Sequence, residues 1–580
     1  MSWTPDSDLQ ENIFYLAVQN SLQYEGKGQF SSVMGKVMGT FPEIRQYAKE
    51  LTEIIKESVD NANQLASTHG LKHLKEILEE NAPNLLERKI KEKRTGLPEL
   101  KNAINGKVIL RFAPNPNGPL SFGHSRGIII NSEYAKKYNG KWILRFDDTD
   151  TVRKPPMPEA YNLIQEEVEW LTGKPADQVI IASDRIKTYY KYAHELIEKG
   201  GAYICTLTAD EFRTYRQNKS NSPDRSRSPE ENIILWEKML KGDFLPGEAV
   251  VRIKTDMTLP NPALRDWPAL RIQDTDVNPH PRNSIHSKYK VWPLLDFQSG
   301  IDDHLEGVTH IIRGKDLMDS TRKQTLLYEY FNWSYPETVY WGRVKIHEFG
   351  GFSTSNMKND IAEGKYTGWD DSRLPTIASM RKRGFTPEGL RNFWIELALT
   401  QKDISASMAT INSHNVKIID ATTPRLFFVR NPILLELTKG DYDIPPTFKS
   451  QLHPENISMG YRIWNLSIEN MKIYIEKEDL ELAQKNNNRI RLKDFADIAI
   501  HKNIASIRSI TPNENLPIIH WLDSNHSEKA TLETTNEDNL KLIDGFLEIS
   551  SITELKQTLQ LERIGYAKLN NKNELVFLHD

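Results

Sequence analysis

The sequence lacks several features that mark whole classes of protein. It holds one cysteine, Cys205, among 580 residues, which excludes an internal disulfide and a multi-cysteine zinc cluster, so no zinc is expected. No apolar run reaches about twenty residues, the length that crosses a bilayer. The first residues carry acids where a signal peptide has a basic start. These absences predict a cytoplasmic protein with no membrane partner.

Two common nucleotide-binding signatures are also missing. The sequence contains neither Gly-x-Gly-x-x-Gly nor Gly-x-x-x-x-Gly-Lys-Ser/Thr, so a dinucleotide fingerprint and a P-loop are both excluded. A net charge of −4 argues against a uniformly basic surface for nucleic acid. A local basic stripe stays compatible with RNA binding, because binding depends on how charge is distributed.

The hydrophobic pattern predicts a multidomain α/β protein. Strand-length apolar runs at 107–112, 141–146 and 178–184 alternate with stretches of helical spacing, which is typical of parallel βαβ units in a doubly wound, Rossmann-type sheet. Short β-rich pieces near the C-terminus favour antiparallel barrels. The expected regions are 1–105, helical; 106–204, the first half of the Rossmann domain; 205–297, an inserted domain; 298–350, its second half; 351–418, a mobile loop and connecting helices; and 419–580, β-barrels.

Polar residues close the predicted parallel strands. They are Arg111, the run Arg145–Asp150, the run Ser183–Arg185, and the run Arg313–Asp316. In an open parallel sheet, ligands bind beyond the carboxyl ends of the strands. Four such groups in one sheet therefore indicate a binding site at this edge.

The stretch "RFAPNPNGPLSFGHSR" at 111–126 joins the first strand to the next helix. Gly123 lets a ligand approach the backbone, and the helix N-terminus offers unpaired N–H groups to a phosphate. His124 could donate to a phosphate oxygen. The alternative is that Ser125 caps the helix and His124 is a solvated turn residue.

Two other segments could contact substrates. "GGFSTSNMKND" at 350–360 is interpreted either as a mobile loop that closes over phosphates or as a solvated Ser/Thr loop. Further on, Arg381, Lys382, Arg383 and Arg391 could contact an RNA backbone, although a charged helix face is usually just solvated.

Taken together, five stretches resemble class I aminoacyl-tRNA synthetases of the glutamyl and glutaminyl subfamily, most closely the archaeal-type glutamyl enzymes. The resemblance is good from about 107 to 420 and weaker on either side. The stretches are "RFAPNPNGPLSFGH", "RFDDTD", "SPDRSRSPEENIILWEKM", "DDHLEGVTHIIRGKD" and "GWDDSRLPTIASMRKRGFTPEGLRNF".

The resemblance implies a reaction and its partners. L-glutamate would be activated with ATP to glutamyl-adenylate, with Mg²⁺ bridging the ATP phosphates, and then transferred to the terminal ribose of tRNA-Glu. The inserted domain would grip the acceptor stem and the C-terminal barrels would read the anticodon. The protein would be a monomer, and whether it also charges tRNA-Gln stays open.

The resemblance also implies roles for single residues. Arg111 matches the arginine that grips the amino acid, Asp147 the acid facing its amino group, and Arg313 the arginine that pairs with the glutamate side chain. Leu295 replaces a tyrosine of the glutaminyl enzymes, and Asp150 in "DDTD" also favours a glutamyl enzyme. By the same resemblance, the positions expected to bind ATP are Pro114, Gly123, His124, Ser353 and Ser355.

Two positions depart from the family pattern. Ser121 stands where the first motif usually has its first histidine, and Thr354 stands where the second motif has its second lysine. Ser121, His124, Thr354 and Lys358 are the expected catalytic residues, and Lys358 could supply the missing charge. The departures keep a non-catalytic tRNA-binding paralogue open, and a glutaminyl-tRNA synthetase is the nearest enzymatic alternative.

Overall fold

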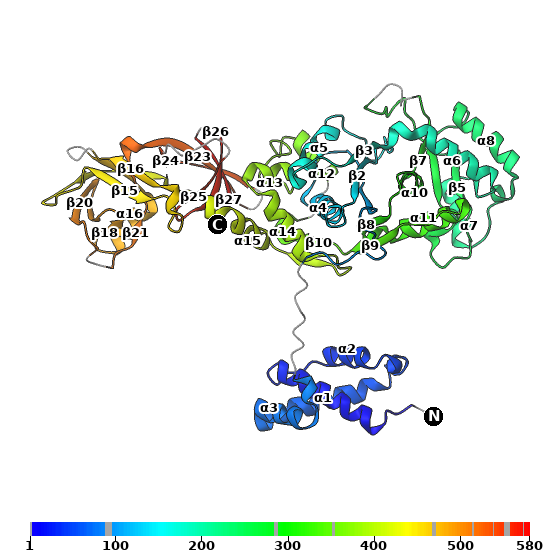
Figure 1. Cartoon of the computed structure of the whole chain (residues 1–580), viewed down its shortest axis with the longest axis horizontal. Helices are drawn as coiled ribbons and strands as arrows, with labels where there is room; N and C mark the ends of the chain where they lie inside the picture. Colours follow the sequence, from blue (N-terminus) through cyan, green and yellow to red (C-terminus); the bar gives the residue numbers. More distant parts are fainter. Residues whose placement is uncertain are drawn as a thin grey trace. The chain divides into compact units, whose positions relative to one another are not determined.

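The chain divides into two compact units, Met1–Thr95 and Gly96–Asp580, in the computed structural model shown in Figure 1. The structure describes residues 3–86, 96–282, 288–350, 354–466, 471–512, 515–536, 539–549, 557–571 and 573–580. No helix in these ranges is both long and apolar enough to cross a bilayer.

The N-terminal unit is helical, as predicted. Its helices are α1 (Ser7–Gln23), α2 (Phe30–Thr40) and α3 (Leu51–Asn81). Their apolar faces meet in one core that includes the fully buried Ile13, Val37 and Ile55. Helix α3 is kinked at Gly70, where φ is +81°, a value that glycine adopts without a steric penalty.

The second unit begins with the predicted alternation of strands and helices. Strands β1 (Ile109–Phe112), β2 (Lys141–Phe146) and β3 (Gln178–Ile181) are parallel and in sequence order. They alternate with α4 (Phe122–Lys137), α5 (Ala160–Thr172) and α6 (Ile186–Glu198). This part of the fold prediction is confirmed.

The parallel arrangement resumes after the insertion, on the other side of β1. Strands β8 (His310–Gly314) and β9 (Glu337–Trp341) pair in parallel and are joined by α11 (Met318–Phe331), while α10 (Leu295–Leu305) precedes them. The Thr309 N–H donates to the Ile109 carbonyl over 2.9 Å, so β8 begins beside β1. Strand β2 therefore lies on one side of β1 and β8 on the other, so the order of the strands reverses at β1. In open parallel sheets a ligand-binding crevice lies at such a switch in strand order.

The insertion forms a sheet of its own with flanking helices. Its antiparallel strands are β4 (Ala202–Cys205), β5 (Val250–Ile253), β6 (Pro268–Ile272) and β7 (Val291–Pro293), with α7 (Ala209–Gln217) and α8 (Pro229–Lys241). Helix α8 begins with a capping box, in keeping with the local sequence Ser-Pro-Glu-Glu. The Ser228 N–H donates to Glu231 Oε2 over 2.7 Å, and the Glu231 N–H donates to Ser228 Oγ over 3.3 Å.

The segment that follows is mainly helical and differs from the prediction at one point. Its elements are β10 (Val344–Ile346), α12 (Thr354–Ala362), α13 (Ile377–Arg383), α14 (Pro387–Leu397), β11 (Ile404–Ala406) and α15 (Met408–Ile419). The prediction of a loop at 350–360 is wrong from Thr354 onward, because α12 begins there. Met357 is 2% exposed and packs with Tyr366 and Leu374, so its burial favours a helix over a solvated loop.

The C-terminal part is β-rich, as predicted, and consists of two seven-stranded sheets and a hairpin. Its elements are β12 (Arg425–Leu426), β13 (Phe428–Arg430), β14 (Pro432–Thr438), β15 (Thr447–Gln451), β16 (Tyr461–Asn465), β17 (Lys472–Glu476), α16 (Lys477–Lys485), β18 (Arg489–Leu492), β19 (Asp497–His501), β20 (Ile504–Ser509), β21 (Ile518–Ile519), β22 (Leu522–Asp523), β23 (Ser527–Asn536), β24 (Asn539–Glu548), β25 (Thr558–Leu561), β26 (Gly565–Asn571) and β27 (Glu574–His579).

Helix α13 connects the α/β part to these sheets. Lys382 forms an ion pair with Glu533 of β23 at 3.3 Å, and the Arg383 guanidinium donates to the Leu578 carbonyl of β27 over 2.7 Å. Burial lowers the pKa of Arg383 to about 10. These two residues, considered above as RNA contacts, are therefore engaged within the protein.

Close packing of α4 on β1 leads to a testable expectation. A Cβ at Gly127 would stand 2.4 Å from the Phe112 ring, whereas a Cβ at Gly123 on the same helix would meet nothing nearer than 3.8 Å. We expect Gly127→Ala to lower the free energy of unfolding by about 1–3 kcal/mol, because the ring must move. Gly123→Ala should change it by less than about 1 kcal/mol. Denaturant unfolding of both variants checks this, and equal effects would contradict it.

Candidate active site

A buried carboxylate on α10 joins the first two strands of the sheet. Asp303 is fully buried and accepts two hydrogen bonds from Arg111, Nε to Oδ1 and Nη2 to Oδ2, both at 3.1 Å. Its Oδ1 also accepts from Arg145 Nη1 over 2.7 Å. Burial acts to raise the pKa of Asp303, but the charges of Arg111 and Arg145 outweigh it and hold this pKa at about 2. One carboxylate thus fixes two arginines at the carboxyl edge of the sheet.

Asp147 follows β2 and presents an unused oxygen. Its Oδ1 accepts from Arg145 Nε over 2.8 Å, while its buried Oδ2 accepts no hydrogen bond from any residue that the structure describes. Burial raises the pKa of Asp147, and the charge of Arg145 opposes that rise. The backbone is held as well, because the Asp147 N–H donates to the Pro114 carbonyl over 3.0 Å. A buried, unpaired carboxylate oxygen is costly unless a ligand donates to it, and an ammonium group would suit it.

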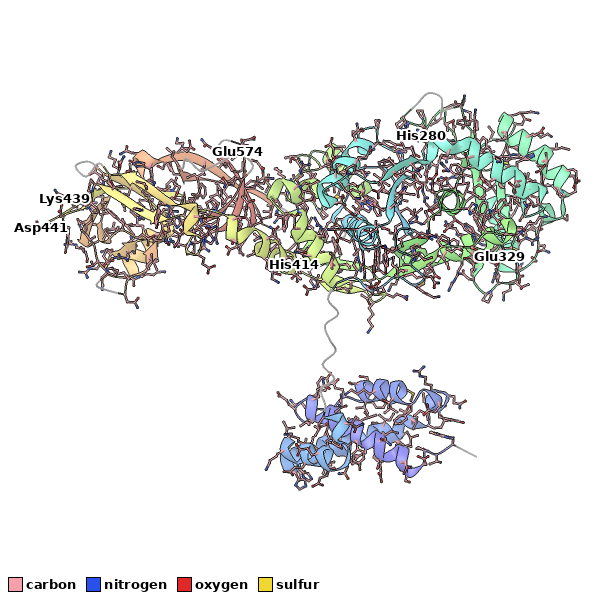
Figure 2. The ribbon with its side chains drawn as sticks, in the orientation of Figure 1. His280, Glu329, His414, Lys439, Asp441 and Glu574 are labelled. Carbon is pink, nitrogen blue, oxygen red and sulfur yellow. The ribbon has the colours of Figure 1, made fainter. Side chains whose placement is uncertain are left out.

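The neighbouring Asp148 is instead fully engaged. It accepts from the Tyr161 hydroxyl over 2.6 Å and from the Ser183 N–H and hydroxyl over 2.8 and 2.7 Å. His280 of the insertion, labelled in Figure 2, lies 3.3 Å from the same carboxylate. Burial acts to raise the pKa of Asp148, but His280 and the two hydroxyls lower it overall. Asp148 therefore anchors the chain beside Asp147.

Arg313 lies near the end of β8 and forms no ion pair among the described residues, although the charge of Asp303 acts on it from farther away. Its side chain is 5% exposed, and its Nη1 donates to Thr321 and Gln324 over 3.3 and 3.2 Å. Its Nε finds no acceptor in the part of the chain that the structure describes. Burial and then the nearby charge of Arg111 lower the pKa of Arg313. A buried guanidinium next to a second positive charge is suited to a carboxylate ligand.

Leu295 starts the helix that carries this network. It lies one and two turns before Ser299 and Asp303, on the same face of α10 as both of them, and is 46% exposed. The Ser299 hydroxyl accepts from Arg145 Nη2 over 2.6 Å. Leu295 therefore lies on the helix face that points to Arg145, and its role stays a prediction.

The turn at 120–124 starts α4 with a neutral histidine. The Ser121 N–H donates to His124 Nδ1 over 3.2 Å, so Nδ1 carries no proton and Nε2 does. Burial, with a smaller effect of Lys154, lowers the pKa of His124 to about 4, which keeps the ring neutral at neutral pH. Ser121 is the N-cap of α4, whereas the Ser125 hydroxyl donates to the Phe122 carbonyl. The alternative that Ser125 caps this helix is therefore wrong.

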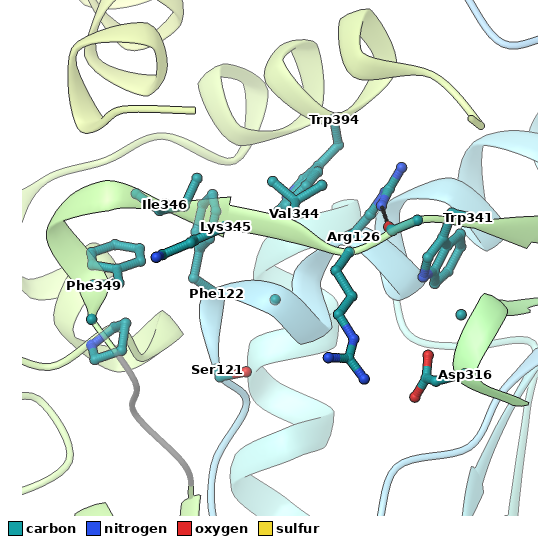
Figure 3. A pocket seen from close by; sticks show the side chains of 16 residues that line it. Ser121, Phe122, Arg126, Asp316, Trp341, Val344, Lys345, Ile346, Phe349 and Trp394 are labelled. Atoms are coloured by element: carbon teal, nitrogen blue, oxygen red, sulfur yellow. Dashed lines mark hydrogen bonds between the residues drawn. The ribbon is translucent and has the colours of Figure 1, made fainter. Parts of the chain in front are cut away.

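A pocket of about 470 Å³ adjoins this turn (Figure 3). Ser121, Phe122 and Gly123 form one wall, and β10 forms another; the other lining residues include Gly314, Asp316, Phe349 and Trp394. Strand β10 pairs with β11 along one edge. Apolar side chains, a strand edge and a helix N-terminus together suit a nucleotide, with the base between the apolar walls and the phosphates at α4.

Arg126 links the segments that line this pocket. Its guanidinium donates to the Gly342 and Ala398 carbonyls over 2.9 and 3.0 Å. It also lies 5.0 and 5.7 Å from the ring centres of Trp341 and Trp394. Burial lowers the pKa of Arg126 to about 10. Arg126 therefore ties α4 to the chain on both sides of β10.

Helix α12 begins against the turn that follows β1. A Cβ at Gly118 would stand 2.6 Å from Thr354 Cγ2, so this contact requires glycine. Lys358 is exposed on the same helix. Ser353 lies outside the residues that the structure describes, as does the side chain of Ser355.

The site contains residues that the sequence analysis did not single out: Asp303, Ser299, Gly118 and Arg126. Asp303 lies 192 residues from Arg111, and no local pattern announces that pairing. The buried pair Asp302–Asp303 in "DDHLEG" was the available signal, because adjacent buried acids need cations.

The described residues offer no group of three or more His, Cys, Asp or Glu side chains that could hold a metal ion.

Removing the charge of Asp303 should destabilise the fold. We expect Asp303→Asn to lower the free energy of unfolding at neutral pH by about 3–5 kcal/mol, because Arg111 and Arg145 lose a buried partner. The pKa of Asp303 is lowered in the folded state, so its stabilisation is present above about pH 4 and is lost as pH falls toward 2.

Denaturant unfolding at neutral and acid pH measures both effects. The variant should lose less stability than the wild type between about pH 4 and 2. Asp210→Asn is the control, since the Asp210 side chain is 83% exposed and its pair with Arg213 should contribute under about 1 kcal/mol. Equal losses in the two variants would contradict the assignment.

Comparisons with known proteins identify the family of this chain. Residues 107–421 match the family described as tRNA synthetases class I (E and Q), catalytic domain, and residues 423–512 match its anti-codon binding domain. A glutamate–tRNA ligase of Archaeoglobus fulgidus is 42% identical over 571 residues, covering 98% of each chain. One of Methanosarcina mazei is 43% identical over 563 residues, covering 96% of this chain and 95% of its own. The chain therefore belongs to the glutamyl and glutaminyl family of class I tRNA synthetases.

Proposed function

We propose that this protein is a glutamate–tRNA ligase, which joins L-glutamate to the 3′ end of tRNA-Glu through a glutamyl-adenylate. The observation that carries the proposal is the buried Arg313, which forms no ion pair among the described residues and lies close enough to Arg111 for the two charges to interact. The relatives at 42–43% identity, which bear the name glutamate–tRNA ligase, support it.

The amino-acid site uses charge at both ends of the substrate. Arg313 binds the side-chain carboxylate, Arg111 grips the amino acid from β1, and Asp147 Oδ2 accepts from the ammonium group. A glutamine amide would leave the buried charge of Arg313 uncompensated. The free energy lost in this way exceeds the free energy gained from a hydrogen bond to a neutral amide. Leu295 has no hydroxyl group, whereas a tyrosine at this position of α10 would have one.

Activation takes place where the amino-acid site meets the nucleotide pocket. An oxygen of the substrate α-carboxylate attacks the α-phosphorus of ATP, and the bond to pyrophosphate breaks. His124 donates from Nε2, and the α4 N-terminus at Ser121 and Gly123 stabilises the charge that develops on the phosphates. Mg²⁺, where bound, reduces the charge of those phosphates. Thr354, Ser353, Ser355 and Lys358 are assigned to the same phosphates.

The remaining regions are assigned to tRNA. The insertion at 205–297 grips the acceptor stem, and the β-rich part at 419–580 forms barrels that read the anticodon, in keeping with the family match over 423–512. The parallel strands belong to a doubly wound, Rossmann-type sheet shared by 106–204 and 298–350. The helical region at 1–105 and the connecting segment at 351–418 complete a cytoplasmic monomer.

A charging assay tests the function. Purified protein, ATP and Mg²⁺ are incubated with radiolabelled glutamate or glutamine, and with tRNA-Glu or tRNA-Gln. Transfer of glutamate to tRNA-Glu supports the proposal. Preference for glutamine would identify a glutaminyl enzyme, and pyrophosphate exchange at background even with tRNA present would identify a non-catalytic paralogue.

Arg313 is the residue that should separate glutamate from ATP. We expect Arg313→Ala to raise KM for glutamate by about 10- to 100-fold, the effect of losing charge-assisted hydrogen bonds. KM for ATP should stay within about threefold, because Arg313 is not among the residues lining the nucleotide pocket. Arg313→Lys, which keeps the charge but not the planar fork, should fall between the two. An equal loss toward both substrates, with unchanged melting temperature, would refute the assignment.

A further inference from the structure

A buried glutamate on α5 reaches the backbone of the nucleotide turn from behind. Glu167 is 6% exposed, and its Oε2 accepts from the Leu120 N–H over 2.8 Å. Leu120 directly precedes Ser121, the N-cap of α4. Glu167 itself is not among the residues that line the nucleotide pocket.

The hydrogen bond from the Leu120 N–H is one of several that hold the three consecutive residues 120–122. The Leu120 carbonyl accepts from the Ile377 N–H over 2.9 Å, and the Phe122 N–H donates to the Pro375 carbonyl over 2.8 Å. The Ser121 N–H donates to the His124 ring. The partners at 375 and 377 are backbone groups. In contrast, Glu167 holds the turn through a side chain that comes from another helix, α5.

The surroundings of Glu167 favour its neutral form. Burial raises its pKa to about 8, against the Leu120 hydrogen bond and the charge of Arg381. It lies on the wall of a cavity of about 830 Å³ between α5, α13 and the C-terminal sheet. The charged residues lining that cavity are Glu166, Asp370, Arg381, Lys382, Glu533, Lys568 and Glu574, the last labelled in Figure 2. A glutamine side chain is therefore a close substitute for Glu167 in shape and charge.

We propose that Glu167 is a positioning residue for the nucleotide turn, one that holds the Leu120 N–H and so places Ser121, Gly123 and His124 for ATP. The proposal rests on the proposed function for the meaning of that turn. Glu167 acts through the backbone and does not touch the substrates, so its loss should affect the use of ATP more than the use of glutamate.

Three variants separate positioning from general stability. Glu167→Ala removes the acceptor, and Glu167→Gln keeps an acceptor oxygen at the same place. Glu166→Ala is the matched control, because Glu166 is the adjacent residue of α5, is exposed, and lines the same cavity.

The experiment combines amide exchange with kinetics. In Glu167→Ala, amide hydrogen exchange in the peptide containing Leu120 should become about tenfold faster or more, since its protecting hydrogen bond is lost. Pyrophosphate exchange, measured with tRNA present, should show KM for ATP raised by about tenfold and KM for glutamate within about twofold. Glu167→Gln should restore the exchange rate at Leu120 and the KM for ATP to their wild-type values. Glu166→Ala should match the wild type in both.

Several results would overturn the proposal. They are unchanged exchange at Leu120 in Glu167→Ala, equal rises in both KM values, or failure of Glu167→Gln to restore them. If Glu167→Ala does not fold, Glu167→Met replaces it, because methionine fills the space but offers no acceptor oxygen. Faster exchange at Leu120 in Glu167→Met than in Glu167→Gln supports the proposal, and equal exchange contradicts it. If the wild type catalyses no pyrophosphate exchange, the proposed function fails, and calorimetric ATP affinity together with Leu120 exchange still tests the role of Glu167.

Discussion

The bridge from Asp303 to Arg111 and Arg145 is the interaction on which the site depends. It joins α10 to the ends of β1 and β2, across 192 and 158 residues of sequence. All three side chains are almost fully buried, so their charges interact in a medium that screens them weakly. Such a network specifies one arrangement, because any other packing would leave a buried charge without its partner.

Among the described residues at this site, Asp147 and Arg313 carry charges that the network does not fully pair. Asp147 keeps one unpaired carboxylate oxygen, and Arg313 keeps a guanidinium that forms no ion pair among the described residues. The first is negative and the second positive, and both lie at the carboxyl edge of the sheet. This is the complement of an amino acid that carries an ammonium group at one end and a carboxylate on its side chain. The specificity proposed for the protein therefore follows from what the fold leaves unpaired.

The nucleotide turn is defined by backbone contacts more than by side chains. Its residues 120–122 are held by hydrogen bonds to the segment 375–377 and to Glu167. That same segment leads into α13, whose Lys382 and Arg383 contact the C-terminal sheet. The turn thus lies between elements that are distant in sequence.

Local patterns were sufficient for most elements. The strands of the α/β part and the capping box of α8 follow from hydrophobic spacing and from turn chemistry over a few residues. Local reasoning failed where a distant contact decided the outcome. The segment after 353 has a loop-like composition, yet Met357 is buried against Tyr366 and Leu374 and the segment is helical. Ser125 looked like a cap, but Trp394 Nε1, 269 residues away, donates to its hydroxyl.

The sequence by itself determined the alternation of strands and helices, the polar residues at the strand ends, and the family that these motifs resemble. Those features depend on neighbours within a few residues, so composition and spacing carry them. Only the tertiary structure decided which arginines form ion pairs with Asp303 and which forms none among the described residues, which nitrogen of His124 holds the proton, and what supports the turn at Leu120. Each of these depends on a buried hydrogen bond to a group far along the chain or on the exact geometry of one turn, which periodicity does not encode.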